Sequence, residues 1–484
     1  IELEKQVDKK DILELYLNAI YLGQGSNGVQ TASETYFGKD NLSELTLSEC
    51  AVIAAITQSP TMYDPVLYPE NNKTRKNIVL QKMLDQELIT QSEYDSAMSD
   101  DVYARISLNK KEDTANKTYN TYYLDSVINT LSNQLVEELG YSETQAYNTI
   151  YSGGLSIYIN QDDTIQQICD EEINNPDNYP ASTSVALNYA LTLTDPKTGD
   201  LYNYSSGHLI NYYAEKTGNP KYNLIYSSED TARAAADEFK AAMIEKTGYQ
   251  ELAESFSTTI QPQTSFVVID QATGYVKAVC GGRGEKIGNL TLNRATDSKR
   301  QPGSTFKVLS TYVPALDNAG MTLATSFMDE PLNYSNGTPV NNWYGGYRGQ
   351  QTIRTAIKDS MNIITVKCFQ EVTPQVGYDY LVNMGITTLK NGTSSVNGIA
   401  ENDINESMCL GGLTEGVTNL ELTAAYASIA NSGTYVEPTF YSKVLDHDGN
   451  ILIDNTPETK QVMKDTTAWL INNAMQDVVT SGTG

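Results

Sequence analysis

The spacing of apolar residues changes along this chain, which excludes a single uniform fold. Up to about residue 100 the apolar residues recur at helical spacing, as in the segments 12–23 and 75–88. An alternating segment appears at 155–159, and from residue 263 two such segments, SFVVI and YVKAV, flank a D-Q-A-T-G turn. Alternation predicts strands, and a period of 3.6 predicts helices. The sequence therefore predicts a helical part followed by mixed α/β parts.

Length and charge limit the possible functions. A chain of 484 residues exceeds the usual size of one hydrophobic core, so we expect two or three domains. Its net charge of −27 repels phosphate backbones and anionic lipid headgroups, so nucleic acid is excluded as a partner and membrane attachment requires a separate anchor. Because the chain opens at Ile1 inside a predicted helix, we expect it to be an internal piece of a longer protein.

Cysteine and histidine offer little for catalysis. The five cysteines are scattered without a C-x-x-C pair, which indicates buried free thiols rather than a metal site or disulfide framework. The only histidines, His208 and His447, lie in a tyrosine-rich stretch and a predicted hairpin turn. A Ser-His-Asp triad or a histidine-rich zinc site is therefore disfavoured.

Composition divides the chain into three predicted parts. Residues 1–100 are helical, residues 101–262 form a polar linker and α/β insert, and residues 263–484 carry strands followed by helices. No chemistry can be assigned to 165–262, which we interpret as a packing module.

The segment R-Q-P-G-S-T-F-K carries the chemistry. It places Ser304 at the start of a predicted apolar helix, with Lys307 one turn later on the same face. A serine hydroxyl needs an adjacent base, and lysine can be that base where burial lowers its pKa. The helix N-terminus also suits a developing oxyanion. Ser304 is thus the candidate nucleophile of an acyl transfer, and Lys307 is its candidate base.

A second motif supports this interpretation. S-x-x-K alone also fits a serine N-cap followed by a surface lysine. The S-M-N motif of Ser360 and Asn362 follows a predicted amphipathic helix, and its hydroxyl can relay a proton while its amide holds a peptide carbonyl. S-x-N alone is weak, since the S-L-N that begins at Ser107 matches it as well. The order of the two motifs is what favours an acyl-transfer site.

These motifs resemble those of the bifunctional (class A) penicillin-binding proteins of bacterial wall synthesis. Toward the C-terminus the resemblance rests on N-R-A-T before R-Q-P-G-S-T-F-K, on G-G…G-V-T and on A-A-Y-A…N-S-G, at residues 293–307, 411–418 and 424–433. K-D-I-L-E-L-Y-L-N, Y-F-G-K, Q-S-P and R-K-N-I-V-L-Q-K-M resemble late motifs of the lipid II glycosyltransferase domain, at 10–18, 36–39, 58–60 and 75–83.

The resemblance implies a multidomain fold and a reaction. The fold comprises an α-helical remnant of a lysozyme-like glycosyltransferase domain, an α/β linker-insert, and an α/β penicillin-binding transpeptidase domain of antiparallel sheet with helices. The implied reaction is D,D-transpeptidation of stem peptides by Ser304, Lys307 and Ser360, with Asn362 binding substrate. It implies no cofactor for transpeptidation, and a divalent metal for the complete glycosyltransferase.

The resemblance also implies partners and a location. Stem peptides and lipid II are the expected substrates, β-lactams the expected inhibitors, and the wall-synthesis machinery the expected protein partner. The expected location is the outer face of the bacterial cytoplasmic membrane, through an N-terminal anchor that this chain lacks.

The chain departs from the family's pattern at both ends. The two glutamates of the glycosyltransferase are missing, and Glu4 and Glu14 are interpreted as helix-surface or structural groups. The family's K-T-G strand is expected after the terminal S-G-T-G. We therefore expect the 484-residue chain to acylate poorly and the full-length protein to be competent.

Three other functions share part of this pattern. A class A β-lactamase shares S-x-x-K, and Glu401 and Asn405 have the spacing of its deacylating loop, but Met361 stands where that family has Asp. A D,D-carboxypeptidase shares the serine chemistry but not the N-terminal segment. A non-catalytic wall-binding scaffold has no reason to keep all of Ser304, Lys307, Ser360 and Asn362.

Overall fold

The structure is a computed structural model that describes residues 9, 13, 16–18, 20–24, 26, 28–60, 62–106, 119–181, 183–286, 288–396 and 399–484. The chain divides into two compact units, Ile1–Thr118 and Tyr119–Gly484. Within the helix predicted at 12–23, residues 12, 15 and 19 lie outside the described residues, as do Glu4, Glu14 and Ser107; Leu13 and residues 16–18 are helical, whereas residues 20–23 are not.

The first unit is helical, as the sequence predicts. It contains α2 (Gly28–Phe37), α3 (Leu47–Ile56), α4 (Pro69–Asp85) and α5 (Gln91–Ser99). Helix α4 begins earlier than the sequence pattern suggests, because Pro69 fits the first turn of a helix. The Y-F-G-K motif has a structural role, since the buried Tyr36 hydroxyl donates to the Leu22 carbonyl at 2.7 Å and Lys39 pairs with Glu49 at 2.6 Å.

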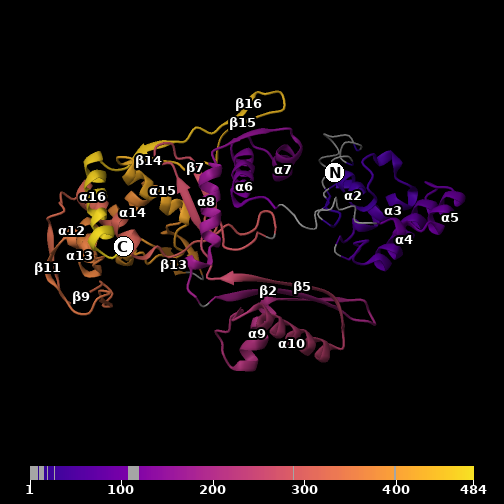
Figure 1. Ribbon diagram of the computed structural model, residues 1–484, viewed down its shortest axis with the longest axis horizontal. Coiled ribbons are helices and arrows are strands. Elements are labelled where there is room, and N and C mark those ends of the chain that lie inside the picture. Colours follow the sequence, from indigo (N-terminus) through magenta and orange to yellow (C-terminus); the bar gives the residue numbers. More distant parts are fainter. Residues whose placement is uncertain are drawn as a thin grey trace. The chain divides into compact units, whose positions relative to one another are not determined.

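The second unit is built around the hairpin of β6 (Phe266–Ile269) and β7 (Val276–Cys280), which the sequence predicts. Helix α8 (Asp163–Asn174) packs against β7, and α15 (Asn419–Ala430) packs against β6 (Figure 1). Beside them, β1 (Ser156–Ile159), β15 (Tyr441–Leu445) and β16 (Ile451–Asp454) form an antiparallel sheet in the order β1-β15-β16.

The second unit also contains further strand pairs and a helix beside α6. The pairs are β8 (Ser326–Asp329) with β11 (Gly349–Thr352), β9 (Leu332–Asn333) with β10 (Pro339–Val340), β12 (Asn391–Val396) with β13 (Ile399–Asn402), and β14 (Thr434–Val436) with β17 (Thr459–Gln461). The helix is α7 (Glu143–Ser152), which packs on α6 (Tyr122–Glu137).

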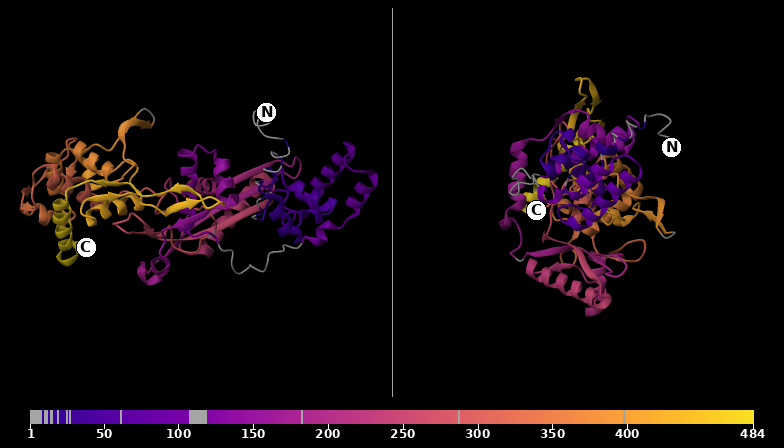
Figure 2. Two further views of the ribbon diagram at one scale, coloured as in Figure 1. Left: turned by 90° about the horizontal axis from the view of Figure 1, so that it is seen from above. Right: turned by 90° about the vertical axis from the view of Figure 1, so that its right-hand side faces the viewer.

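Residues 184–261 have a hydrophobic core of their own. Strands β2 (Ser184–Thr194), β3 (Leu201–Ser205), β4 (Ile225–Tyr226) and β5 (Gln250–Gln261) form a sheet in which β2 pairs with each of the others. Helices α9 (Ser206–Thr217) and α10 (Glu229–Thr247) lie on one face of it (Figure 1, Figure 2). Alternate β2 residues are buried against these helices, as a half-covered sheet requires: Leu187, Tyr189, Leu191 and Leu193.

The boundaries predicted at residues 100 and 262 are not the boundaries between the compact units. Helix α6 lies within the predicted linker, yet it packs on the C-terminal part of the chain. Its Tyr123 is fully buried, with the hydroxyl 2.7 Å from the carbonyls of both Val276 and Phe440. The predicted linker and insert therefore divide among several hydrophobic cores, because strand pairing and burial rather than composition decide where a domain ends.

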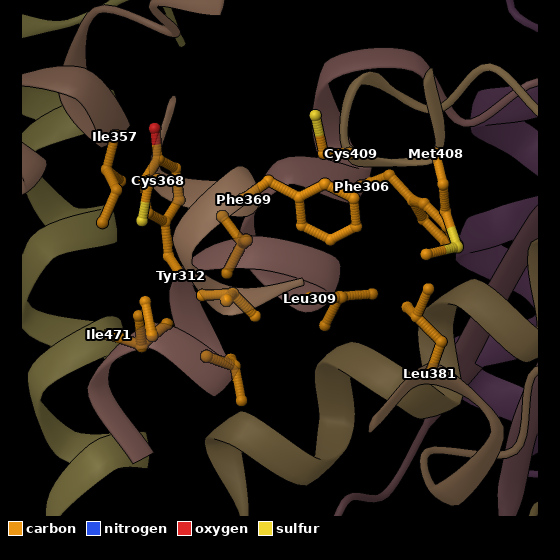
Figure 3. Close-up of a cluster of buried hydrophobic side chains, with 14 of the residues drawn as sticks. Phe306, Leu309, Tyr312, Ile357, Cys368, Phe369, Leu381, Met408, Cys409 and Ile471 are labelled. Carbon is orange, nitrogen blue, oxygen red and sulfur yellow. The ribbon is translucent and has the colours of Figure 1, made fainter. Parts of the chain in front are cut away.

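The largest hydrophobic core is helical (Figure 3). The helix that begins with Ser304 runs through a 3₁₀ turn, η5 (Gly303–Thr305), a π-helical turn, η6 (Val308–Tyr312), and α11 (Val313–Asp317). It packs among α12 (Ile353–Lys358), α13 (Asn362–Val372), α14 (Pro374–Asn383) and α16 (Asp465–Ser481). The π-helical turn has a cause in the sequence: Pro314 has no N–H to continue the α-helical pattern, and the Val313 N–H bonds to Val308 O.

The cysteines match the sequence analysis with one exception. Cys169, Cys280, Cys368 and Cys409 are buried free thiols, whereas Cys50 is exposed. Among the described residues, no helix has the length and apolar character needed to cross a bilayer.

The packing of α14 against the π-helical turn predicts the effect of a single methyl group. A Cβ added at Gly377 would lie 2.4 Å from the Phe369 ring and 2.7 Å from the Ser310 carbonyl. We expect Gly377→Ala to destabilise the second unit by about 1–3 kcal/mol, because overpacking forces neighbouring groups to move. Gly345→Ala is the matched control, since its Cβ would have no neighbour within 4 Å. Thermal unfolding checks this, and equal midpoints for the two variants would contradict it.

Candidate active site

Ser304 and Lys307 lie on the same stretch of helix but in different environments. Ser304 is exposed in the 3₁₀ turn η5, where side chains three residues apart eclipse each other. Lys307 is the next side chain along that line and is only 2% exposed. An accessible serine is therefore followed, three residues later, by a buried lysine.

The segment before Ser304 is clamped by the G-G…G-V-T region. Gln301 and Leu413 exchange two hydrogen bonds of 2.6 and 2.7 Å, and the Arg300 and Val417 backbones exchange two of 2.9 Å. Two glycines permit this approach, because a Cβ on Gly411 would lie 2.4 Å from the Gly303 nitrogen and one on Gly416 would lie 2.4 Å from the Arg300 carbonyl carbon. These motifs are among those on which the family resemblance rests, and the structure gives their physical role.

The Lys307 amine is surrounded by acceptors from the S-M-N motif. Its Nζ lies 2.8 Å from Ser360 O, 3.0 Å from Ser360 Oγ and 2.6 Å from Asn362 Oδ1. These three contacts match the three donors of an ammonium group. Burial nonetheless lowers the pKa of Lys307 from 10.5 to about 8, because desolvation penalises the charged form.

Ser360 reaches Lys307 through an unusual backbone conformation. It lies between α12 and α13 with φ +50°, in the left-handed region that non-glycine residues rarely adopt. The following residue, Met361, is fully buried, and its N–H bonds to Ala356 O at 3.0 Å. This anchored turn brings the carbonyl and the hydroxyl of Ser360 to the same amine, and such strain is concentrated at functional sites.

Hydrogen bonds connect some of the candidate site residues and not others. In the part of the chain that it describes, the hydrogen bonds of Lys307 reach Ser360 and Asn362 but not Ser304. Glu401 is engaged elsewhere, since it accepts from Ser394 Oγ at 3.0 Å, and Asn405 caps the short helix η7 (Glu406–Leu410). The predicted base therefore contacts the relay serine, and the nucleophile lies one helical turn before the base in the sequence.

Two residues that support the S-M-N motif could not be predicted from the sequence. Asn342 Oδ1 accepts from the backbone N–H groups of Asn362 and Ile363 at 3.0 and 3.2 Å. Its own amide nitrogen donates to Asp329 at 2.8 Å. The segment between β8 and β11 has no helical or alternating pattern, so only the folded chain shows that these residues meet the S-M-N motif.

The arrangement suits proton transfer between neighbouring oxygens. A lysine of pKa about 8 is neutral in about a tenth of molecules at pH 7, which leaves an amine lone pair beside the Ser360 hydroxyl. Among the described residues, no group of three or more His, Cys, Asp and Glu side chains is placed to hold a metal ion.

The chain is similar to known proteins along its whole length. The family model described as "Penicillin binding protein transpeptidase domain" matches residues 264–484, and that described as "Transglycosylase" matches residues 1–84. Penicillin-binding protein 1A of Clostridium botulinum is 28% identical over 504 residues, covering 100% of this chain and 50% of the relative. Penicillin-binding protein 1A/1B of Bacillus subtilis is 27% identical over 486 residues, covering 100% and 42%.

A solved structure agrees in fold. The crystal structure of penicillin-binding protein 1A from Haemophilus influenzae aligns with a TM-score of 0.52 and 22% sequence identity, covering 99% of this chain and 74% of that one. The chain spans about half the length of the curated relatives that it matches.

The two family matches occur in a recognisable order along the chain. A transglycosylase segment followed by a transpeptidase domain is the domain order of a bifunctional wall-synthesis protein. The chain belongs to the class A penicillin-binding proteins, and the resemblance found in its motifs is confirmed. The predicted fold class, a helical transglycosylase remnant with an antiparallel α/β transpeptidase domain, is confirmed as well.

The environment of Lys307 predicts its titration. We expect its Cε resonance, in NMR of the protein carrying ¹³C-labelled lysine, to titrate with a midpoint of about 8 and to be absent in Lys307→Met. Between this value and 10.5 the unfolded chain binds more protons than the folded chain, so stability from this residue rises with pH across that window. A midpoint above 10 would contradict the site described.

Proposed function

We propose that this chain provides the acylating part of a serine D,D-transpeptidase that cross-links peptidoglycan stem peptides. The observation that carries the proposal is the buried Lys307, whose pKa is lowered to about 8 and whose amine contacts Ser360 and Asn362 next to the exposed Ser304. A neutral lysine that contacts one serine and follows another by one helical turn can serve as the base of an acyl transfer without histidine.

The proposed acylation proceeds by proton transfer through Lys307. The neutral amine takes the Ser304 proton as Oγ attacks the penultimate D-Ala carbonyl of a stem peptide, and the helix N-terminus stabilises the oxyanion. Ser360 relays the proton from Lys307 to the leaving nitrogen, so that D-alanine departs and an ester to Ser304 remains. Asn362 holds a peptide carbonyl of the substrate with its amide. An amine of a neighbouring stem then attacks the ester, releases Ser304 and forms the cross-link.

The remaining roles are proposed on the family relationship. Residues 1–84 match the transglycosylase family, so we assign them to a lipid II glycosyltransferase in which a divalent metal takes part. Transpeptidation itself uses no cofactor. Stem peptides and lipid II are the proposed substrates, β-lactams the inhibitors, and wall-synthesis proteins the partners. The proposed location is the outer face of the cytoplasmic membrane, through an N-terminal anchor.

Labelling by a fluorescent penicillin tests the assignment of the nucleophile. In the full-length protein we expect an adduct on Ser304, mapped by mass spectrometry, and its loss by about 10³-fold or more in Ser304→Ala. Ser481→Ala is the control, because that serine is exposed at the end of α16. Labelling that persists in Ser304→Ala would overturn the proposal.

The pKa of Lys307 predicts the pH dependence of acylation. Because the neutral amine is the base, the acylation rate should rise about tenfold per pH unit below 8 and level off above it. Stopped-flow acylation from pH 6 to pH 10 measures this profile. Lys307→Met should remove the dependence along with most of the rate, whereas Lys246→Met, an exposed lysine on α10, should change neither.

A further inference from the structure

Helix α13, which begins at Asn362, receives its N-terminal cap from a distant part of the chain. Its own N-cap residue, Met361, has an apolar side chain and makes no capping hydrogen bond. The first N–H groups of a helix need an acceptor, and here Asn342 Oδ1 accepts from Asn362 and Ile363 at 3.0 and 3.2 Å. The start of this helix is therefore held by the segment that connects β10 to β11.

Asp329 fixes which way the Asn342 amide points. Asp329 is 1% exposed, and its carboxylate accepts three hydrogen bonds: from Asn342 Nδ2 at 2.8 Å, from the Tyr344 hydroxyl at 2.9 Å and from the Arg348 backbone N–H at 2.8 Å. A carboxylate that accepts at all these positions can only face the NH₂ side of Asn342. The carbonyl side of Asn342 must then face the helix.

The same reasoning fixes the Asn362 side chain. Its Nδ2 donates to the Asn341 carbonyl at 2.7 Å, and a carbonyl can only accept. The Asn362 oxygen is thereby turned toward Lys307 Nζ, 2.6 Å away. Asn341 and Asn342 thus hold both the backbone and the side chain of the residue that contacts the lysine.

We propose that Asp329 and Asn342 are positioning residues that orient Asn362 on Lys307 by a one-way donor–acceptor chain, running from the Asp329 carboxylate through the Asn342 amide to the start of α13. The inference rests on the proposed acyl transfer, whose geometry it deepens. Neither residue touches substrate, and each acts through the next group of the donor–acceptor series.

The series of donors and acceptors can be tested by exchanging the carboxylate at position 329 with the amide at position 342. In Asn342→Asp two carboxylates face each other, and in Asp329→Asn two NH₂ groups face each other. The double variant Asp329→Asn/Asn342→Asp restores the match, since an amide at 329 can donate to 342 and still accept from Tyr344 and Arg348. The carboxylate at 342 keeps an oxygen for the helix N–H groups, a favourable place for negative charge.

We expect each single variant to lower the acylation rate constant of the full-length protein by about 10–100-fold, because a small displacement of a catalytic group is costly. The dissociation constant for penicillin should change much less, and the double variant should recover to within about threefold of wild type. Stopped-flow kinetics separate the two constants, and thermal unfolding reports whether each variant is folded. Asn336→Asp is the control, since the Asn336 side-chain oxygen likewise accepts from a backbone N–H, that of Thr338, in the exposed turn between β9 and β10.

The outcomes separate the two proposals. Single variants that acylate at the wild-type rate, or a double variant as slow as the slower single one, would overturn the positioning role and leave the acyl transfer standing. A wild-type protein without an adduct on Ser304 would overturn both. Recovery of the rate constant in the swap supports the donor–acceptor chain, even where the single variants unfold at lower temperature.

Discussion

Burial of the Lys307 amine is the constraint on which the rest of this site depends. A charged amine at 2% exposure requires acceptors on every side, and the structure provides three, from Ser360 and Asn362. The same burial lowers the pKa to about 8 and so makes the neutral amine accessible near physiological pH. One environment thus stabilises the position of the lysine and prepares it to act as a base.

The frame around Lys307 has to be rigid because its contacts come from segments far apart in sequence. The segment before Ser304 is clamped by hydrogen bonds from residues 413–417, and the helix that follows packs against α13. Ser360 adopts a strained backbone conformation, which the burial of Met361 between α12 and α13 can sustain. Close approach of backbones is possible only where Gly411 and Gly416 leave space. Packing around the site thus holds the catalytic geometry in place.

Local chemistry explains the irregular stretches of the fold. The helix after Ser304 changes its hydrogen-bonding pattern where Pro314 cannot donate, and Gly377 leaves room beside it. Residues 184–261, for which the sequence suggests no chemistry, bury alternate residues of β2 under two helices and so form a core of their own. Helices α6 and α7, which precede them, pack instead with β7 and β15 in a separate core of the second unit, which composition alone does not reveal.

The sequence by itself determined the elements and the identity of the candidate site. Periodicity predicted the hairpin at 263–280, the strand at 155–159 and the helix at 75–88, and the order of S-x-x-K and S-M-N indicated both the chemistry and the family. Only the tertiary structure decided that Lys307 contacts Ser360 and Asn362 rather than Ser304, and that Asp329 and Asn342 support them. The reason is physical: periodicity and motif spacing report local backbone and solvent exposure. Hydrogen bonds between segments follow from packing that no local pattern records.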